Sequence, residues 1–227
     1  MVLDGIEVAD YVRGKLGKKK VILVGLSWGS MLGVRMVKSR PDLFYAYVGT
    51  GQSVSYLKGK IQAYAQLLAE ARARGNHQAI QELEGIGPPP HDSTEKAGTH
   101  TRWANRYEPG IPSNWSAAAT VLFDSPVGVS DLRNLMAGIR TSEDHFRREI
   151  EAGDLPAFGT DFAIPMFFFQ GAQDNVAPAA QVQAYVESMT APQKRLVLIP
   201  NAGHNAIATR SAEFLRLLRE LVRPLAQ

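Results

Sequence analysis

A run of four apolar residues that leads into a Gly-x-Ser-x-Gly pentapeptide constrains this chain more than any other feature. Residues 21–24 read VILV, and the pentapeptide GLSWG occupies residues 25–29. Apolar residues then recur at helical spacing as far as Pro41. A buried strand, a sharp turn and a helix in this order are typical of a nucleophile elbow, which exposes a serine hydroxyl above the sheet. The pattern therefore predicts that Ser27 is a nucleophile.

The residue types around Ser27 fit the geometry of such a turn. We expect side chains at Gly25 and Gly29 to collide with the neighbouring chain, so that only glycine fits at both positions. Ser27 would stand at the N-terminus of a helix, where backbone N–H groups and the helix dipole favour a developing oxyanion. The backbone N–H of Trp28 is thus the first candidate donor of an oxyanion hole.

Two further strands are predicted late in the chain, and each is followed by a polar residue. Residues 164–171 (IPMFFFQG) are apolar and aromatic and are bounded by proline and glycine, and Asp174 follows them. Residues 195–199 (RLVLI) form the next such run, and His204 lies just past its end. Ser27, Asp174 and His204 therefore each follow a strand, which is where the sites of open α/β sheets lie.

This placement predicts a Ser-His-Asp triad. His204 would take the proton from Ser27 and return it to the leaving group, while Asp174 would hold the imidazole in the useful tautomer. Taken alone, Asp174 is equally well explained as a cap of the helix that begins near Pro178, and His204 as a residue of a turn. Their joint position after successive strands favours the triad over both explanations.

Composition excludes several classes of site. The 227 residues include no cysteine, which excludes disulfides and thiolate metal sites. The five histidines are scattered without the spacing of metal ligands. We therefore expect no metal. The net charge of +3 is mild, and we expect no nucleic-acid partner. Because no apolar run approaches the length of a membrane span and no signal peptide is recognisable, we expect no membrane partner and a cytoplasmic location.

Helices and strands alternate at both ends of the chain, which predicts an α/β fold with a parallel sheet and right-handed crossovers. We expect residues 1–52 and 162–227 to form this core. Its predicted strands lie at 21–24, 45–49, 166–170 and 195–199, and its first two helices lie at 3–16 and 30–38.

The intervening residues 53–161 show no such alternation and are expected to form a helical cap that acts as a lid. Thr141 and Asp144 resemble a capping box and predict the start of a helix. The helices expected in this insertion lie at about 55–74, 77–85, 93–107, 114–123, 130–139 and 142–152.

These motifs together resemble the α/β-hydrolase fold superfamily. The resemblance rests on GLSWG at 25–29, QGAQD at 170–174, AGH at 202–204 and the helical insertion after Gln52. The Ser-Trp-Gly elbow with a helical cap is most similar to the prolyl iminopeptidase-like branch. That branch includes aminopeptidases that cleave an N-terminal proline and also esterases and other acyl hydrolases. The resemblance implies that neither a metal nor an organic cofactor takes part.

The chain departs from the superfamily pattern in its first part. Several strands normally precede the elbow strand, and an early loop of His-Gly-Gly type supplies the second oxyanion donor. Nothing in residues 1–20 resembles that loop. We therefore expect a truncated sheet of about four strands, with the source of the second donor unknown. The strand at 21–24 would be an open apolar edge, and such edges tend to pair or to be covered. This predicts a homodimer that uses this edge or the helices at 3–16 and 30–38.

Three functions remain open at this point. The first is a carboxylesterase that acts on small or short-chain acyl esters through an acyl-enzyme, which needs only the triad and a tolerant pocket. The second is a prolyl-type aminopeptidase, which needs a carboxylate in the lid to hold the substrate ammonium. Glu82 and Glu84 are conceivable for this role, but alternating residues of a helix are more typical of a solvated face. The third is a hydrolase fold with weak or no activity that serves binding or assembly. The intact triad argues against the third, and we favour the first because it needs no further group.

Overall fold

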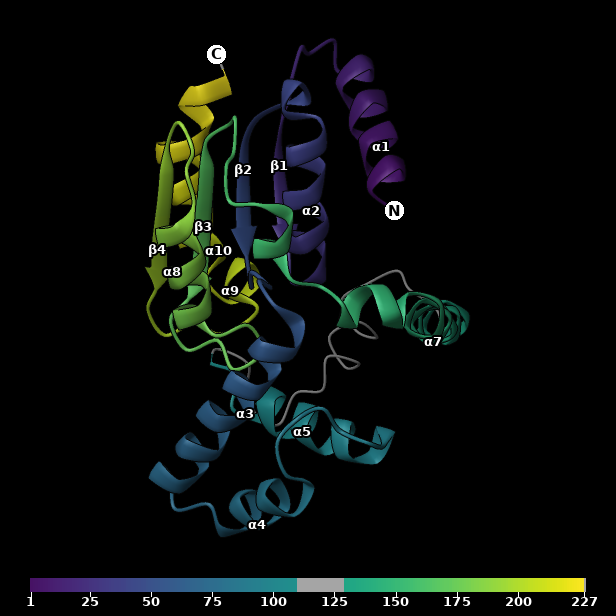
Figure 1. Ribbon diagram of the computed structural model, residues 1–227, viewed down its shortest axis with the longest axis vertical. Helices are drawn as coiled ribbons and strands as arrows, with labels where there is room; N and C mark the ends of the chain where they lie inside the picture. Colours follow the sequence, from purple (N-terminus) through teal and green to yellow (C-terminus); the bar gives the residue numbers. More distant parts are fainter. Residues whose placement is uncertain (110–128, 227) are drawn as a thin grey trace.

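The computed structural model describes residues 1–109 and 129–226 (Figure 1). Four parallel strands form one sheet in the order β1-β2-β3-β4. All four predicted strands and the α/β fold class are confirmed, and each strand end lies within two residues of its predicted position. The strands are β1 (Val21–Leu26), β2 (Phe44–Thr50), β3 (Met166–Gly171) and β4 (Lys194–Ile199).

Helices cover both faces of this sheet, as a parallel sheet requires. One face packs against α1 (Val2–Lys15), α2 (Trp28–Ser39) and α8 (Ala179–Ser188). The other packs against α9 (Ala206–Thr209), α10 (Ser211–Leu217) and the turns η3 (Leu218–Val222) and η4 (Arg223–Ala226). Strand β3 is buried along its whole length because its aromatic side chains point alternately into the two apolar layers. The sheet is therefore a rigid base for the loops at its carboxyl edge.

The insertion, residues 53–161, begins and ends at one place on the core. The backbone N–H of Leu155 donates to Val54 O and that of Tyr56 donates to Gly153 O, each at 2.8 Å. Figure 1 shows α3, α4 and α5 beyond the carboxyl ends of the strands and α7 to the side of the sheet. The described elements of the insertion are α3 (Tyr56–Ala73), α4 (His77–Ile86), α5 (Thr94–Arg106), α7 (Val129–Glu151) and the 3-10 turn η2 (Leu155–Phe158).

The described part of the insertion has an apolar cluster of its own, which holds α3, α4 and α5 together. Leu67 and Leu83 are completely buried in it, and Trp103 and Tyr107 close its other side. The hydroxyl of Tyr64 donates to the carbonyl of Leu83 at 2.9 Å and fastens α3 to α4. These three helices therefore approach the carboxyl edge of the sheet as one packed layer.

One expectation about the insertion is wrong. The structure has a single helix, α7, where the sequence predicted two helices at 130–139 and 142–152. The hydroxyl of Thr141 donates to the carbonyl of Ala137 at 3.0 Å, one helical turn earlier, instead of capping a new helix. No proline occurs in residues 129–151, and Gly138 is accommodated within the helix, so no strong breaker ends it at Thr141. The helix predicted at 114–123 lies outside the described residues.

The first strand is the sheet edge in the described part of the chain, where β1 pairs with β2 alone. Val24 and Leu26 on this strand are more than one third exposed. Four large apolar side chains of α1 are also exposed to solvent, among charged residues of the same helix: Leu3, Val8, Tyr11 and Leu16 are between 61% and 79% exposed. We refer to these four side chains as the open face of α1.

Candidate active site

Ser27 lies on a strained turn between β1 and α2. Its φ of 54° and ψ of −127° fall in a region that side-chain-bearing residues rarely adopt. The backbone N–H of Ser27 donates to the carbonyl of Thr50 at the end of β2, at 3.1 Å. Trp28 is the first residue of α2, so its backbone N–H has no acceptor within the helix. This is the position that the elbow pattern predicts for a nucleophile, with the backbone N–H of the next residue, Trp28, as one oxyanion donor.

The two glycines of the pentapeptide have different roles. A Cβ at Gly25 would lie 2.7 Å from Cα of Ser30 and 2.9 Å from the carbonyl oxygen of Gly29, so only glycine fits there. A Cβ at Gly29 would have no described atom within 4 Å. The expectation that a side chain at Gly29 collides is therefore wrong. The close approach in this turn is that of α2 to β1, and Gly25 alone stands at that contact.

The structure brings Ser27, His204 and Asp174 into one hydrogen-bonded chain. His204 Nε2 lies 2.8 Å from Ser27 Oγ, and His204 Nδ1 lies 3.0 Å from Asp174 Oδ2. With the proton on Nδ1, the ring donates to the carboxylate and accepts from the serine hydroxyl. An arrangement of this kind can withdraw the proton of the hydroxyl as it attacks a carbonyl carbon. The side chains come from three separate loops, each at the carboxyl end of a strand.

The carboxylate of Asp174 is completely buried and held by several donors. Gln170 Nε2 donates to Oδ2 at 2.7 Å, and the backbone N–H groups of Val176 and Ala177 donate to Oδ1 at 2.8 Å each. Asp174 does not cap α8, because the N-cap of that helix is Pro178 and no side chain caps it. Asp174 instead holds the turn before α8 and also accepts from His204. These donors compensate the burial of its oxygens and fix its orientation.

Two opposing effects act on the pKa of His204. Burial alone would lower it, because a charged imidazole loses its hydration. The hydrogen bond and charge of Asp174, and then the charge of Glu108, outweigh burial and leave the pKa above the ordinary value of histidine. The site therefore stabilises the imidazolium that forms when Ser27 loses its proton.

A buried polar network lies behind the elbow. The hydroxyl of Tyr47 donates to Gln52 Oε1 at 2.8 Å, and the backbone N–H of Gln52 donates to Gln170 Oε1 at 2.9 Å. Gln170 in turn donates to Asp174. Ser30 joins the other end. Its hydroxyl donates to the carbonyl of Ser27, and its own carbonyl lies 2.9 Å from the hydroxyl of Tyr47, whose one proton is shared between this carbonyl and Gln52 Oε1. This network connects the serine turn to the aspartate loop.

Sequence reasoning missed two residues of the insertion that contact the same loops. Gln66 on α3 donates to the carbonyl of Asp174 at 3.3 Å and to Asn175 Oδ1 at 2.8 Å. Glu108, two residues beyond α5, accepts from the backbone N–H of Asn205 at 2.9 Å. Neither residue belongs to a recognisable motif, and only the fold brings them to the site.

Glu82 and Glu84, the carboxylates considered for an ammonium site, both lie on α4. Glu82 accepts from the indole N–H of Trp103 at 2.8 Å and from Arg102. Glu84 pairs with Arg72 of α3 at 2.8 Å. Both carboxylates are thus engaged inside the insertion, and neither contacts Ser27, Asp174 or His204.

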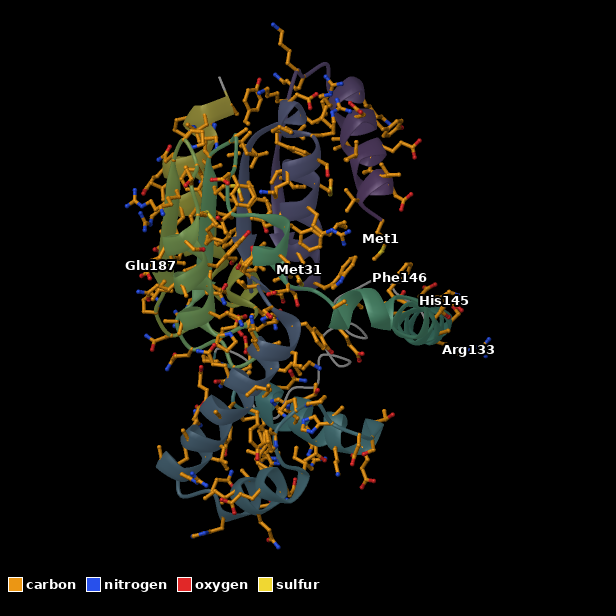
Figure 2. All side chains as sticks on the ribbon, in the orientation of Figure 1. Met1, Met31, Arg133, His145, Phe146 and Glu187 are labelled. Carbon is orange, nitrogen blue, oxygen red and sulfur yellow. The ribbon has the colours of Figure 1, made fainter. Side chains whose placement is uncertain are left out.

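Two hollows in the described part of the chain are candidates for holding a substrate. The larger, about 650 Å³, lies between α4 and α5 and is lined by no residue of the hydrogen-bonded chain. The smaller, about 150 Å³, lies beside the N-terminus of α2 and the end of α7. Its lining is mostly apolar and consists of Trp28, Met31, Leu32, Arg35, Ala152, Gly153 and Phe158. Figure 2 shows Met31 on the side of α2 that faces this junction.

The other described histidines lie outside the site. His77, His91 and His100 belong to the first part of the insertion, and Figure 2 shows His145 on α7, to the side of the sheet. Across residues 1–109 and 129–226, no group of three or more histidine or acidic side chains is arranged to hold a metal ion. In the same residues, no helix is both long and apolar enough to cross a membrane.

Comparison with known proteins places the chain in a family. The model of the alpha/beta hydrolase family matches residues 2–217. The chain therefore belongs to the alpha/beta hydrolase family, and the superfamily that its motifs resemble is confirmed. The strand-turn-helix around Ser27 and the loops that bear Asp174 and His204 all fall within the matched residues.

Individual relatives are distant. The Probable aminopeptidase YbaC of Bacillus subtilis is 25% identical over 207 residues, which make up 89% of this chain and 65% of that protein. The chain thus spans less than two thirds of the length of this curated relative. One similar solved structure is that of VinJ, with a TM-score of 0.61 and 17% identity over 99% of this chain and 73% of that chain. Another is an esterase from Exiguobacterium antarcticum, with a TM-score of 0.58 and 12% identity over 96% of this chain and 72% of that chain. At these identities the solved structures show a shared fold.

Proposed function

We propose that this chain is a serine hydrolase that cleaves small or short-chain acyl esters through an acyl-enzyme. Ser27 would attack the carbonyl carbon, His204 would take its proton and pass it to the leaving alcohol, and Asp174 would hold the imidazole. The backbone N–H of Trp28 would stabilise the oxyanion. The observation that carries this proposal is the 2.8 Å contact between Ser27 Oγ and His204 Nε2, with Asp174 on the opposite ring nitrogen.

Esters of small acids fit the site better than larger or less reactive substrates. An ester has a better leaving group than an amide, so the triad with one identified oxyanion donor can act on it. The hollow of about 150 Å³ is lined by Trp28, the neighbour of Ser27, and by apolar side chains. This volume is small beside the pockets of about 300–1,000 Å³ that hold drug-sized ligands, and it suits a short acyl chain.

A prolyl-type aminopeptidase is the second candidate, and the name of the Bacillus subtilis relative favours it. Such an enzyme needs a carboxylate that is free to bind a substrate ammonium beside the scissile bond. Glu82 and Glu84 do not meet this requirement, because each is engaged within the insertion. A binding or assembly role without catalysis is the third candidate and predicts an inert Ser27.

A direct comparison of substrates tests the proposal. We would measure hydrolysis of p-nitrophenyl acetate and butyrate beside proline p-nitroanilide, with the wild type and the Ser27→Ala variant. The esterase proposal predicts turnover of the esters alone and its loss in Ser27→Ala, by about a million-fold. Turnover of the anilide with little ester hydrolysis would favour the aminopeptidase. A folded protein that hydrolyses neither the esters nor the anilide would favour the binding role.

A further inference from the structure

Glu108 is a buried carboxylate that reaches out of the insertion to the loop that bears His204. It follows α5, lies 97 positions before Asn205 in the chain, and is only 6% exposed. Its Oε1 accepts from the backbone N–H of Asn205 at 2.9 Å, and the backbone N–H of His204 also interacts with the carboxylate. A buried carboxylate needs such donors to be tolerated.

The loop is fitted closely around this carboxylate. A Cβ at Gly203 would lie 2.6 Å from Cδ of Glu108 and 2.7 Å from its Oε1, so a side chain at that position would displace the carboxylate. On the opposite side, Gly51 at the end of β2 packs against the imidazole of His204. The histidine loop is therefore held between the core and a residue of the insertion.

We propose that Glu108 is a positioning residue that clamps the loop bearing His204 and so makes the competence of the triad depend on the insertion. This inference rests on the proposed function, because the importance of His204 follows from it. The carboxylate does not reach the reacting atoms. It acts through the backbone of His204 and Asn205, and through its charge beside the imidazole.

The charge of Glu108 should affect the pKa of His204, which a residue that only packs against the loop would not do. The charged groups that act on His204 are Asp174 after β3 and Glu108 after α5, and both favour the imidazolium. Burial raises the pKa of Glu108 itself, and its backbone donors partly oppose this. Replacing Glu108 by glutamine keeps the size and one acceptor oxygen but removes the charge. Such a change should lower the pKa of His204 without displacing the loop.

The test compares Glu108→Gln, Glu108→Ala and Glu84→Gln with the wild type. Glu84→Gln removes an equal charge from an exposed site on α4 and serves as the matched control. We would measure kcat and KM for p-nitrophenyl acetate from pH 5 to 9. Glu108→Gln should move the acid limb of kcat/KM to lower pH, and Glu84→Gln should leave it in place. Glu108→Ala should lower kcat by about 10- to 100-fold, with little change in KM.

Coincident acid limbs in Glu108→Gln and the wild type would overturn the proposal. If Glu108→Ala does not fold, Glu108→Gln alone decides. An NMR titration of the His204 ring, with its resonance identified from a His204→Gln variant, separates this inference from the proposed function. If the wild type has no hydrolase activity, the proposed function fails, while a lower His204 midpoint in Glu108→Gln still supports the clamp. An unchanged titration midpoint of His204 in Glu108→Gln would refute the positioning role of Glu108.

Discussion

Gly51 packs directly against the imidazole of His204, so that a Cβ at position 51 would lie 3.0 Å from Cε1 and 3.1 Å from Nδ1 of the ring. Gly51 also has a φ of +49°, which side-chain-bearing residues rarely adopt. Two independent constraints therefore require glycine at the end of β2. The ring of His204 is placed by this backbone as well as by its hydrogen bonds.

Gly51→Ala should therefore impair the site. We expect kcat for ester hydrolysis to fall by about 10- to 100-fold as the ring is displaced, and the free energy of unfolding to fall by about 1–2 kcal/mol from the positive φ. Steady-state kinetics and urea denaturation give the two values. Gly85→Ala, at a helical position with no described atom within 4 Å of its Cβ, should leave both values close to those of the wild type. Unchanged kinetics in Gly51→Ala would mean that the ring position does not matter.

The different surroundings of Gly25 and Gly29 predict opposite effects on stability. Gly25→Ala should cost about 1–3 kcal/mol, because its Cβ meets the backbone of Ser30. Gly29→Ala should be neutral or stabilising by up to about 1 kcal/mol, because alanine favours the first turn of α2 and its Cβ has open space. Urea denaturation of both variants is the measurement. Equal destabilisation would contradict the description of this turn.

The pKa of His204 sets the pH dependence of activity. A general base must be neutral, so kcat/KM should fall as pH falls through the pKa of this residue. Asp174 and Glu108 outweigh burial and raise that pKa, so the midpoint should lie above 6.5, the ordinary value. Asp174→Asn removes the strongest raising interaction and should lower both the midpoint and, by about 10,000-fold, kcat. A midpoint below 6.5 in the wild type would contradict this balance of effects.

The open face of α1 predicts self-association of the purified chain. Four exposed apolar side chains on one helix, beside an open sheet edge, form a surface that tends to be covered. We propose that a second copy covers it, and that sedimentation at low micromolar concentration detects a dimer. The double variant Val8→Glu, Tyr11→Glu should dissociate it, whereas Leu135→Glu on α7 should not. A wild type that is monomeric under these conditions would refute the dimer.

Much of the core could be predicted from the sequence because its signals are local. Each strand is a continuous apolar run, and continuous runs indicate strands buried on both faces. The carboxyl ends of parallel strands lie at one edge of the sheet, so polar residues just after the strands had to meet there. This reasoning brought Ser27, Asp174 and His204 together without any knowledge of the sheet order.

The insertion was predicted less well, because its contacts are set by tertiary packing. The sequence around Thr141 resembles a capping pattern, but no proline interrupts residues 129–151 and the helix continues through it. Glu108 and Gln66 are single polar residues without a motif, so no pattern distinguishes them from residues on a solvated face. Glu82 and Glu84, the only lid carboxylates that the sequence analysis considered, form contacts within the insertion itself. Only the packing of α3 and α5 against the core identifies the residues near the site.

The most direct test of the central claim is labelling of the folded protein with a fluorophosphonate probe, followed by mass spectrometry of its peptides. The probe reacts with an activated serine and needs no knowledge of the substrate. The account predicts one adduct, on the peptide that contains Ser27, which is lost in Ser27→Ala and strongly slowed in His204→Ala. The claim that Ser27 is an activated nucleophile would be contradicted by a folded protein that takes up no label, or by one labelled on another serine.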